Sequence, residues 1–97
     1  MTDRELLEMA AKAAGREWLS YHLTKGMCCR DDSYGGLIEY YWNPLTDDGD
    51  AMRLAVKLGI DISGVQLKYW DKTSKNPYAA TRRAIVLAAA EIGKEIK

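Results

Sequence analysis

The chain has 97 residues, of which 47% are hydrophobic and 29% charged, and we expect a single compact domain spanning residues 1–97. Fourteen basic residues balance fourteen acidic ones, and a formal net charge of zero disfavours a nucleic-acid binder that tracks phosphates. No apolar run approaches the ~20 residues that span a bilayer, and we expect no membrane association. Asp3 and Glu5 near the amino end are unlike a secretory or transit signal, so a cytoplasmic protein is expected.

A helix is predicted over residues 3–14. Thr2 and Glu5 have the spacing of a capping box, apolar residues then recur at helical intervals, and Gly15 provides the stop.

Two strands are predicted next, over residues 18–23 and 37–42, from their aromatic and alternating sequences. Residues 24–36 between them are polar and contain glycine, so we expect a long connection. Pro44 ends the second strand because proline cannot donate to a ladder.

A second helix follows this proline. Ala51, Leu54, Ala55 and Leu58 mark its apolar face, and Gly59 terminates it.

The segment from residue 60 to residue 70 predicts a hairpin that turns on Ser63-Gly64, with its apolar side chains on one face.

A final helix begins with Asn76 as its cap and Pro77 at its first position. Its predicted buried stripe consists of Tyr78, Ile85, Ala89 and Ile92.

The expected order of elements is therefore α-β-β-α-β-β-α. The second helix would be a right-handed crossover between parallel strands, and each outer strand would run antiparallel to its neighbour. The predicted fold is an α+β alpha-beta-alpha sandwich with a mixed four-stranded sheet.

Three segments together resemble a known family: "TDRELLEMAAKAAG", "WNPLTDDGDAMRLAVKLG" and "PYAATRRAIVLAAAEIG". They are similar to the small bacteriophage and prophage proteins of the phage ABA-sandwich domain family. The resemblance implies a helix–sheet–helix sandwich and expression from a phage genome in a bacterial host cytoplasm. The resemblance implies no biochemical activity, because none is assigned to the family. It therefore identifies no catalytic residue in this chain.

Asp47, Asp48 and Asp50 crowd the start of the second helix. Capping and helix-dipole interactions, with a local pair between Asp50 and Arg53, explain their presence. A divalent cation held by the three carboxylates is the weaker alternative, because the spacing lacks the pattern of a calcium-binding loop. No metal and no cofactor are therefore assigned.

Trp42 and Asn43 precede these aspartates, where the predicted crossover would form a ligand crevice. A phosphate there would need an intervening cation, because the aspartates repel anions. Glycine-rich phosphate-loop motifs are absent from the sequence.

Arg82 and Arg83 are predicted at the opposite end of the sheet, with the Arg82 guanidinium far from the Asp47 carboxylate. That end would be a mixed cluster able to receive an anionic ligand or a partner, although a solvated surface is the simpler reading. Its other members would be Lys25, Arg30, Lys72 and Lys75, diluted by Asp31, Asp32 and Asp71.

The remaining candidates lack partners in the sequence. His22 has no evident triad partner, and the adjacent Cys28 and Cys29 would be reactive only if Arg30 lowered their pKa values. Trp70 alternates away from its apolar neighbours and would be covered by a helix or exposed as an interaction patch.

The leading hypothesis is a non-enzymatic phage accessory protein that binds a host or phage protein or a small ligand, with a homo-oligomer possible. Its candidate ligand-binding residues are Trp42, Asn43, Asp47, Asp48, Asp50, Arg82 and Arg83. The alternative is a small divalent-metal-dependent enzyme acting on a phosphorylated substrate at the three aspartates.

Overall fold

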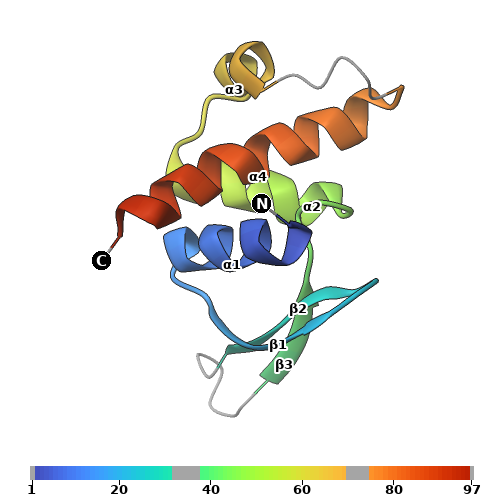
Figure 1. The fold of residues 1–97 in the computed structure, drawn as a ribbon, viewed down its shortest axis with the longest axis vertical. Helices are drawn as coiled ribbons and strands as arrows, with labels where there is room; N and C mark the ends of the chain where they lie inside the picture. Colours follow the sequence, from blue (N-terminus) through green and yellow to red (C-terminus); the bar gives the residue numbers. More distant parts are fainter. Residues whose placement is uncertain (1, 32–37, 70–74, 97) are drawn as a thin grey trace.

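The computed structural model describes residues 2–31, 38–69 and 75–96. These residues form an α+β fold, with four helices and a three-stranded antiparallel sheet (Figure 1). In chain order the elements are α1 (Asp3–Ala14), β1 (Glu17–His22), β2 (Gly26–Asp31), β3 (Ile38–Trp42), α2 (Asp48–Leu58), α3 (Ile62–Tyr69) and α4 (Pro77–Glu95).

The predicted ends of α1 are confirmed. The Thr2 side chain accepts a hydrogen bond from the Glu5 amide and the Glu5 carboxylate accepts one from the Thr2 amide, which completes the capping box. Gly15 closes the helix in the left-handed conformation, with φ of 70°.

The predicted end of α2 and the predicted start of α4 are also confirmed. Gly59 closes α2 with φ of 65°, and Asn76 caps α4 by accepting hydrogen bonds from the amides of Tyr78 and Ala79. Pro77 occupies the first turn of α4 as expected.

The strand β2 was not predicted, because residues 24–36 were interpreted as a connection. Met27 and Cys29 are fully buried while Arg30 is exposed, so the segment has the alternation of a half-buried strand. Cys29 behaves here as a small hydrophobic residue. β2 lies between β1 and β3 and is antiparallel to both. The predicted direct pairing of the strand over residues 18–23 with the strand over residues 37–42 was therefore wrong.

The predicted hairpin over residues 60–70 was also wrong, because residues 62–69 form α3. The Asp61 side chain accepts a hydrogen bond from the Ser63 amide at 3.1 Å, and the Asp61 carbonyl accepts one from the Val65 amide at 3.0 Å. Ile62 and Val65 then lie three residues apart on the side that packs against the core. The four-stranded mixed sheet and the crossover therefore do not form.

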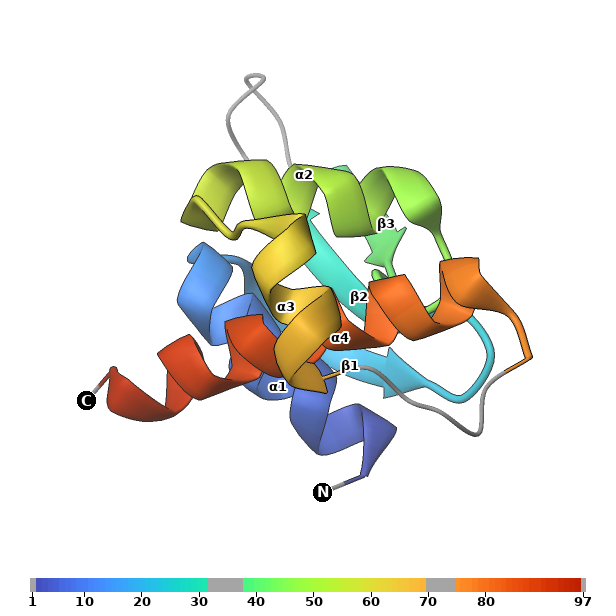
Figure 2. The ribbon, with the colours of Figure 1, turned by 90° about the horizontal axis from the view of Figure 1, so that it is seen from above.

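All four helices lie on one side of the sheet, so the arrangement differs from the predicted alpha-beta-alpha sandwich (Figures 1 and 2). α1 packs against α4 and against the inner face of the sheet, while α3 lies outermost against α4. The core lies between the sheet, α1, α2 and α4. Its largest fully buried side chains include Trp42, Leu6, Leu7, Met27 and Val86.

The predicted buried stripe of α4 is half right. Ile85 and Ala89 are buried, but Tyr78 is 69% exposed and Ile92 is 38% exposed. No helix among the described residues is long and apolar enough to cross a membrane.

Candidate functional site

The turn between β3 and α2 is held by Asn43 and two of the three aspartates. The Asp47 side chain accepts a hydrogen bond from the Asp50 amide at 2.9 Å, and Asp47 is therefore the cap of α2. The Asn43 amide donates to the Asp50 carboxylate at 3.0 Å, and the Asn43 side chain accepts from the Leu45 amide at 3.2 Å. These residues shape the entry to α2.

The three aspartates have different partners. Asp47 caps the helix, while Asp50 accepts a hydrogen bond from Arg53 at 2.8 Å, which raises the pKa of Arg53. Asp48 instead binds Arg82 of α4. Within residues 2–31, 38–69 and 75–96, no three His, Cys, Asp or Glu side chains come together as a metal site would need.

Arg82 lies beside the start of α2. Its Nε donates to the carbonyl of Leu45 at 2.9 Å, and its Nη1 lies 2.5 Å from Oδ1 of Asp48. The topology that separated Arg82 from the aspartates was wrong, because α3 replaces the predicted hairpin and α4 packs against α2. Arg83 points elsewhere and pairs with Asp3 of α1 at 3.2 Å.

A cleft of about 270 Å³, which we call the α2–α4 cleft, opens at the Arg82–Asp48 pair. Its walls come from the first half of α2, the start of α3 and the first half of α4. They are lined by Asp48, Ala51, Met52, Ile62, Tyr78, Thr81, Arg82 and Ile85. The cleft is therefore mainly apolar, with one ion pair in its wall.

The two members of this ion pair are unequally exposed. The Arg82 side chain is 16% exposed, whereas the Asp48 side chain is 71% exposed. The cation is therefore fixed in the wall of the cleft, and its carboxylate partner projects into solvent.

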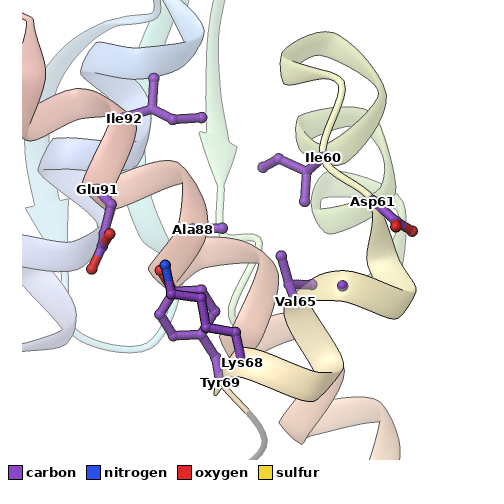
Figure 3. A pocket seen from close by; sticks show the side chains of 9 residues that line it. Ile60, Asp61, Val65, Lys68, Tyr69, Ala88, Glu91 and Ile92 are labelled. Atoms are coloured by element: carbon purple, nitrogen blue, oxygen red, sulfur yellow. The ribbon is translucent and has the colours of Figure 1, made fainter.

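A second, shallower cleft of about 370 Å³ lies between α3 and α4 (Figure 3). Ile60 and Val65 face Ala88 and Ile92 across it. Its charged residues are Asp61, Lys68 and Glu91, and the Lys68 ammonium lies 5.3 Å from the centre of the Tyr69 ring. No sequence-predicted site residue lines this cleft.

Trp42 is separate from both clefts. It is 1% exposed and forms part of the core, where the Arg16 guanidinium lies 5.1 Å from the centre of its ring. Arg16 also donates a hydrogen bond to the hydroxyl of Tyr40. Trp42 therefore packs in the core against the sheet and lines neither cleft.

Cys29 is also a core residue. Its side chain is fully buried, and desolvation raises its pKa to about 11 against the opposing effect of Arg16. A thiol with this pKa is a poor nucleophile at neutral pH. Cys28 is half-buried and Cys29 fully buried, and both are free thiols.

His22 lies on the outer face of the sheet. Its Nδ1 accepts hydrogen bonds from the amides of Thr24 and Lys25, and its ring meets that of Tyr41 edge-on with centroids 6.0 Å apart. The Lys25 ammonium lies 5.0 Å from the centre of the Tyr41 ring.

Among the described residues, three basic side chains of the predicted cluster around Arg82 and Arg83 have separate partners. Lys25 is at the β1–β2 turn, and the two arginines turn to Asp48 and Asp3. Four residues named in the sequence-based predictions lie outside the described part of the chain: Asp32, Trp70, Asp71 and Lys72.

Sequence reasoning selected Asp48 and Arg82 separately and missed the apolar residues between them. Met52 is 50% exposed and Tyr78 is 69% exposed, although both are large. Met52 is a large apolar residue outside the predicted buried face of α2, and this pattern could have indicated an exposed apolar site. The neighbourhood of Tyr78 depended on α3 and could not be inferred.

No protein-family model, no curated protein and no solved structure matches this chain.

Proposed function

We propose that this protein is a binding module, and that the α2–α4 cleft is the place where it holds an apolar group of a small ligand or of a partner protein. The cleft carries the proposal because it combines a mainly apolar lining with an ion pair that can orient a ligand. The origin proposed for the chain is a phage or prophage, on the strength of the three resembling segments.

The size of the cleft supports a small occupant. Its volume of about 270 Å³ is just below the range typical of drug-sized ligand sites, which begins at roughly 300 Å³. A single large side chain or a compact small molecule fits this space. Met52 and Tyr78 at its edge offer further apolar contact area to the rest of a partner.

Binding without catalysis is the function that these residues support best. The carboxylates of Asp47 and Asp50 are occupied by the turn and by Arg53, which leaves Asp48 and Arg82 as the charged groups of the cleft. An ion pair at an apolar opening selects a ligand by charge and orientation.

An NMR titration tests this proposal. The uniformly ¹⁵N-labelled protein is titrated with a panel of small aromatic and aliphatic compounds that includes acids, amines, amides and neutral alcohols. We expect saturable shifts of the amides of Met52 and Thr81, which line the cleft.

Two matched variants complete the experiment. Met52→Glu places a charge in the cleft wall and should abolish those shifts. Val56→Glu makes the same change at a residue of α2 that is 73% exposed and outside the cleft, so it should preserve them. A panel in which no compound perturbs Met52 or Thr81 would show that the proposal is wrong.

A further inference from the structure

Arg82 is held in place independently of Asp48. Its Nε donates to the Leu45 carbonyl at 2.9 Å, and the side chain is only 16% exposed. The guanidinium therefore keeps its position in the cleft wall if the carboxylate moves away. A guanidinium anchored in this way is a suitable receptor for a carboxylate, because its planar array of donors matches two carboxylate oxygens.

Asp48, by contrast, is easily replaced. It is 71% exposed, and Arg82 is its only side-chain ion-pair partner among the described residues. Turning this carboxylate out to water costs little, because most of its surface is already hydrated. A ligand carboxylate can take its place on Arg82 with a near-equal exchange of ion pairs.

The apolar wall then provides the favourable free energy. Met52, Ile62 and Ile85 line the cleft beside the guanidinium, so a ligand whose carboxylate reaches Arg82 buries its apolar part against them. The amino-terminal ends of α2 and α4 also meet at this cleft, and the positive ends of their dipoles favour an anion.

We propose that the α2–α4 cleft binds apolar carboxylic acids, with the ligand carboxylate displacing Asp48 from Arg82. This inference rests on the proposed function, because it names the ligand class of the same cleft. The acid can be a free small molecule or the terminal residue of a partner chain that ends in an apolar amino acid.

A matched series of probes tests the charge requirement: hydrocinnamate, its neutral amide, and phenylpropylamine. All three carry the same phenyl group, so they differ mainly in the charge that meets Arg82 and Asp48. Affinities come from the shifts of the Met52 and Thr81 amides. We expect hydrocinnamate to bind at least about tenfold more tightly than the amide, and the amine to bind most weakly.

Two variants give effects of opposite sign. Asp48→Asn removes the competing carboxylate and should tighten hydrocinnamate binding by about threefold to tenfold, because Arg82 is no longer neutralised. Arg82→Gln should weaken it by about tenfold or more. Lys57→Gln loses the same charge at an exposed position outside the cleft, and should leave the affinity unchanged.

A peptide probe distinguishes the two sources of the acid, a free small molecule and the terminus of a partner chain. An acetylated dipeptide ending in phenylalanine should bind more tightly than hydrocinnamate if the natural ligand is a chain terminus, and no more tightly if it is a free acid. In either case, amidation of the terminal carboxylate should remove most of the affinity.

The outcomes also separate this inference from the proposed function. Equal binding of acid and amide at the cleft would overturn the inference and leave the binding module intact. Preferential binding of the amine, with weaker binding to Asp48→Asn, would overturn it in favour of a cationic ligand. Absence of shifts at the cleft with every compound would overturn both.

Discussion

Gly93 of α4 packs directly on the backbone of Met9 in α1. A Cβ at position 93 would overlap the carbonyl oxygen of Met9, and backbone atoms cannot rotate away as a flexible side chain does. The packing of α4 on α1, the most extensive helix–helix contact among the described residues, therefore depends on a position without a side chain.

Gly93→Ala should consequently destabilise the protein. Helix propensity favours alanine, but the overlap forces α1 and α4 apart and should cost about 1–3 kcal/mol or more. For a domain of this size, each kcal/mol lowers the melting temperature by roughly 4–8 °C. Thermal unfolding followed by circular dichroism measures the effect.

Gly64→Ala is the matched control, because Gly64 is also helical and a Cβ there would lie 3.4 Å from its nearest neighbour. This change should be neutral or slightly stabilising. Equal stability of the Gly93 and Gly64 variants would contradict the close approach of α1 and α4.

The adjacent arginines Arg82 and Arg83 should differ in their contribution to stability. Arg82→Gln removes charge-assisted hydrogen bonds to Leu45 and Asp48 from a mostly buried side chain and should cost about 1–3 kcal/mol. Arg83→Gln removes an exposed pair with Asp3 and should cost about 0–1 kcal/mol. Urea unfolding of the two variants measures the difference, and similar costs would argue against the burial of Arg82.

The two cysteines should react at very different rates with a thiol reagent. Burial raises the pKa of Cys29 to about 11 and blocks access, whereas Cys28 is half-buried. In the native protein, the Cys28→Ser variant should react slowly and the Cys29→Ser variant faster. Comparable rates in the two variants would show that the β2 register is wrong.

Stability should fall with rising pH above the ordinary thiol range. The native state holds the Cys29 proton more tightly than the unfolded chain, so this contribution is complete below about pH 9 and is lost as the pH approaches 11. Cys29→Ala should show a shallower decline in the free energy of unfolding over this interval. Identical pH profiles would contradict the raised pKa of Cys29.

Magnesium should not stabilise the protein specifically. Asp47, Asp48 and Asp50 are directed to a backbone amide, to Arg82 and to Arg53. We expect millimolar Mg²⁺ to change the melting temperature no more than NaCl at equal ionic strength. A larger shift that disappears in Asp48→Asn would instead support the metal-dependent enzyme.

The sequence by itself determined where the helices α1, α2 and α4 begin and where α1 and α2 end. The capping bonds of Thr2, Asp47 and Asn76 join groups at most four residues apart, and Gly15 and Gly59 adopt the left-handed conformation that ends a helix. Such interactions depend on the local chain alone, so the residue types are sufficient to predict them. The capping role of Asp47 could be predicted from the sequence for the same reason.

Only the tertiary structure decided whether residues 60–69 form a hairpin or a helix. Their apolar residues suit either period, and packing of Ile62 and Val65 near α4 selects the helix. That choice brings α4 past the start of α2 and joins Arg82 to Asp48 across 34 residues. The α2–α4 cleft exists because of that packing, since contacts between distant segments depend on the path of the whole chain.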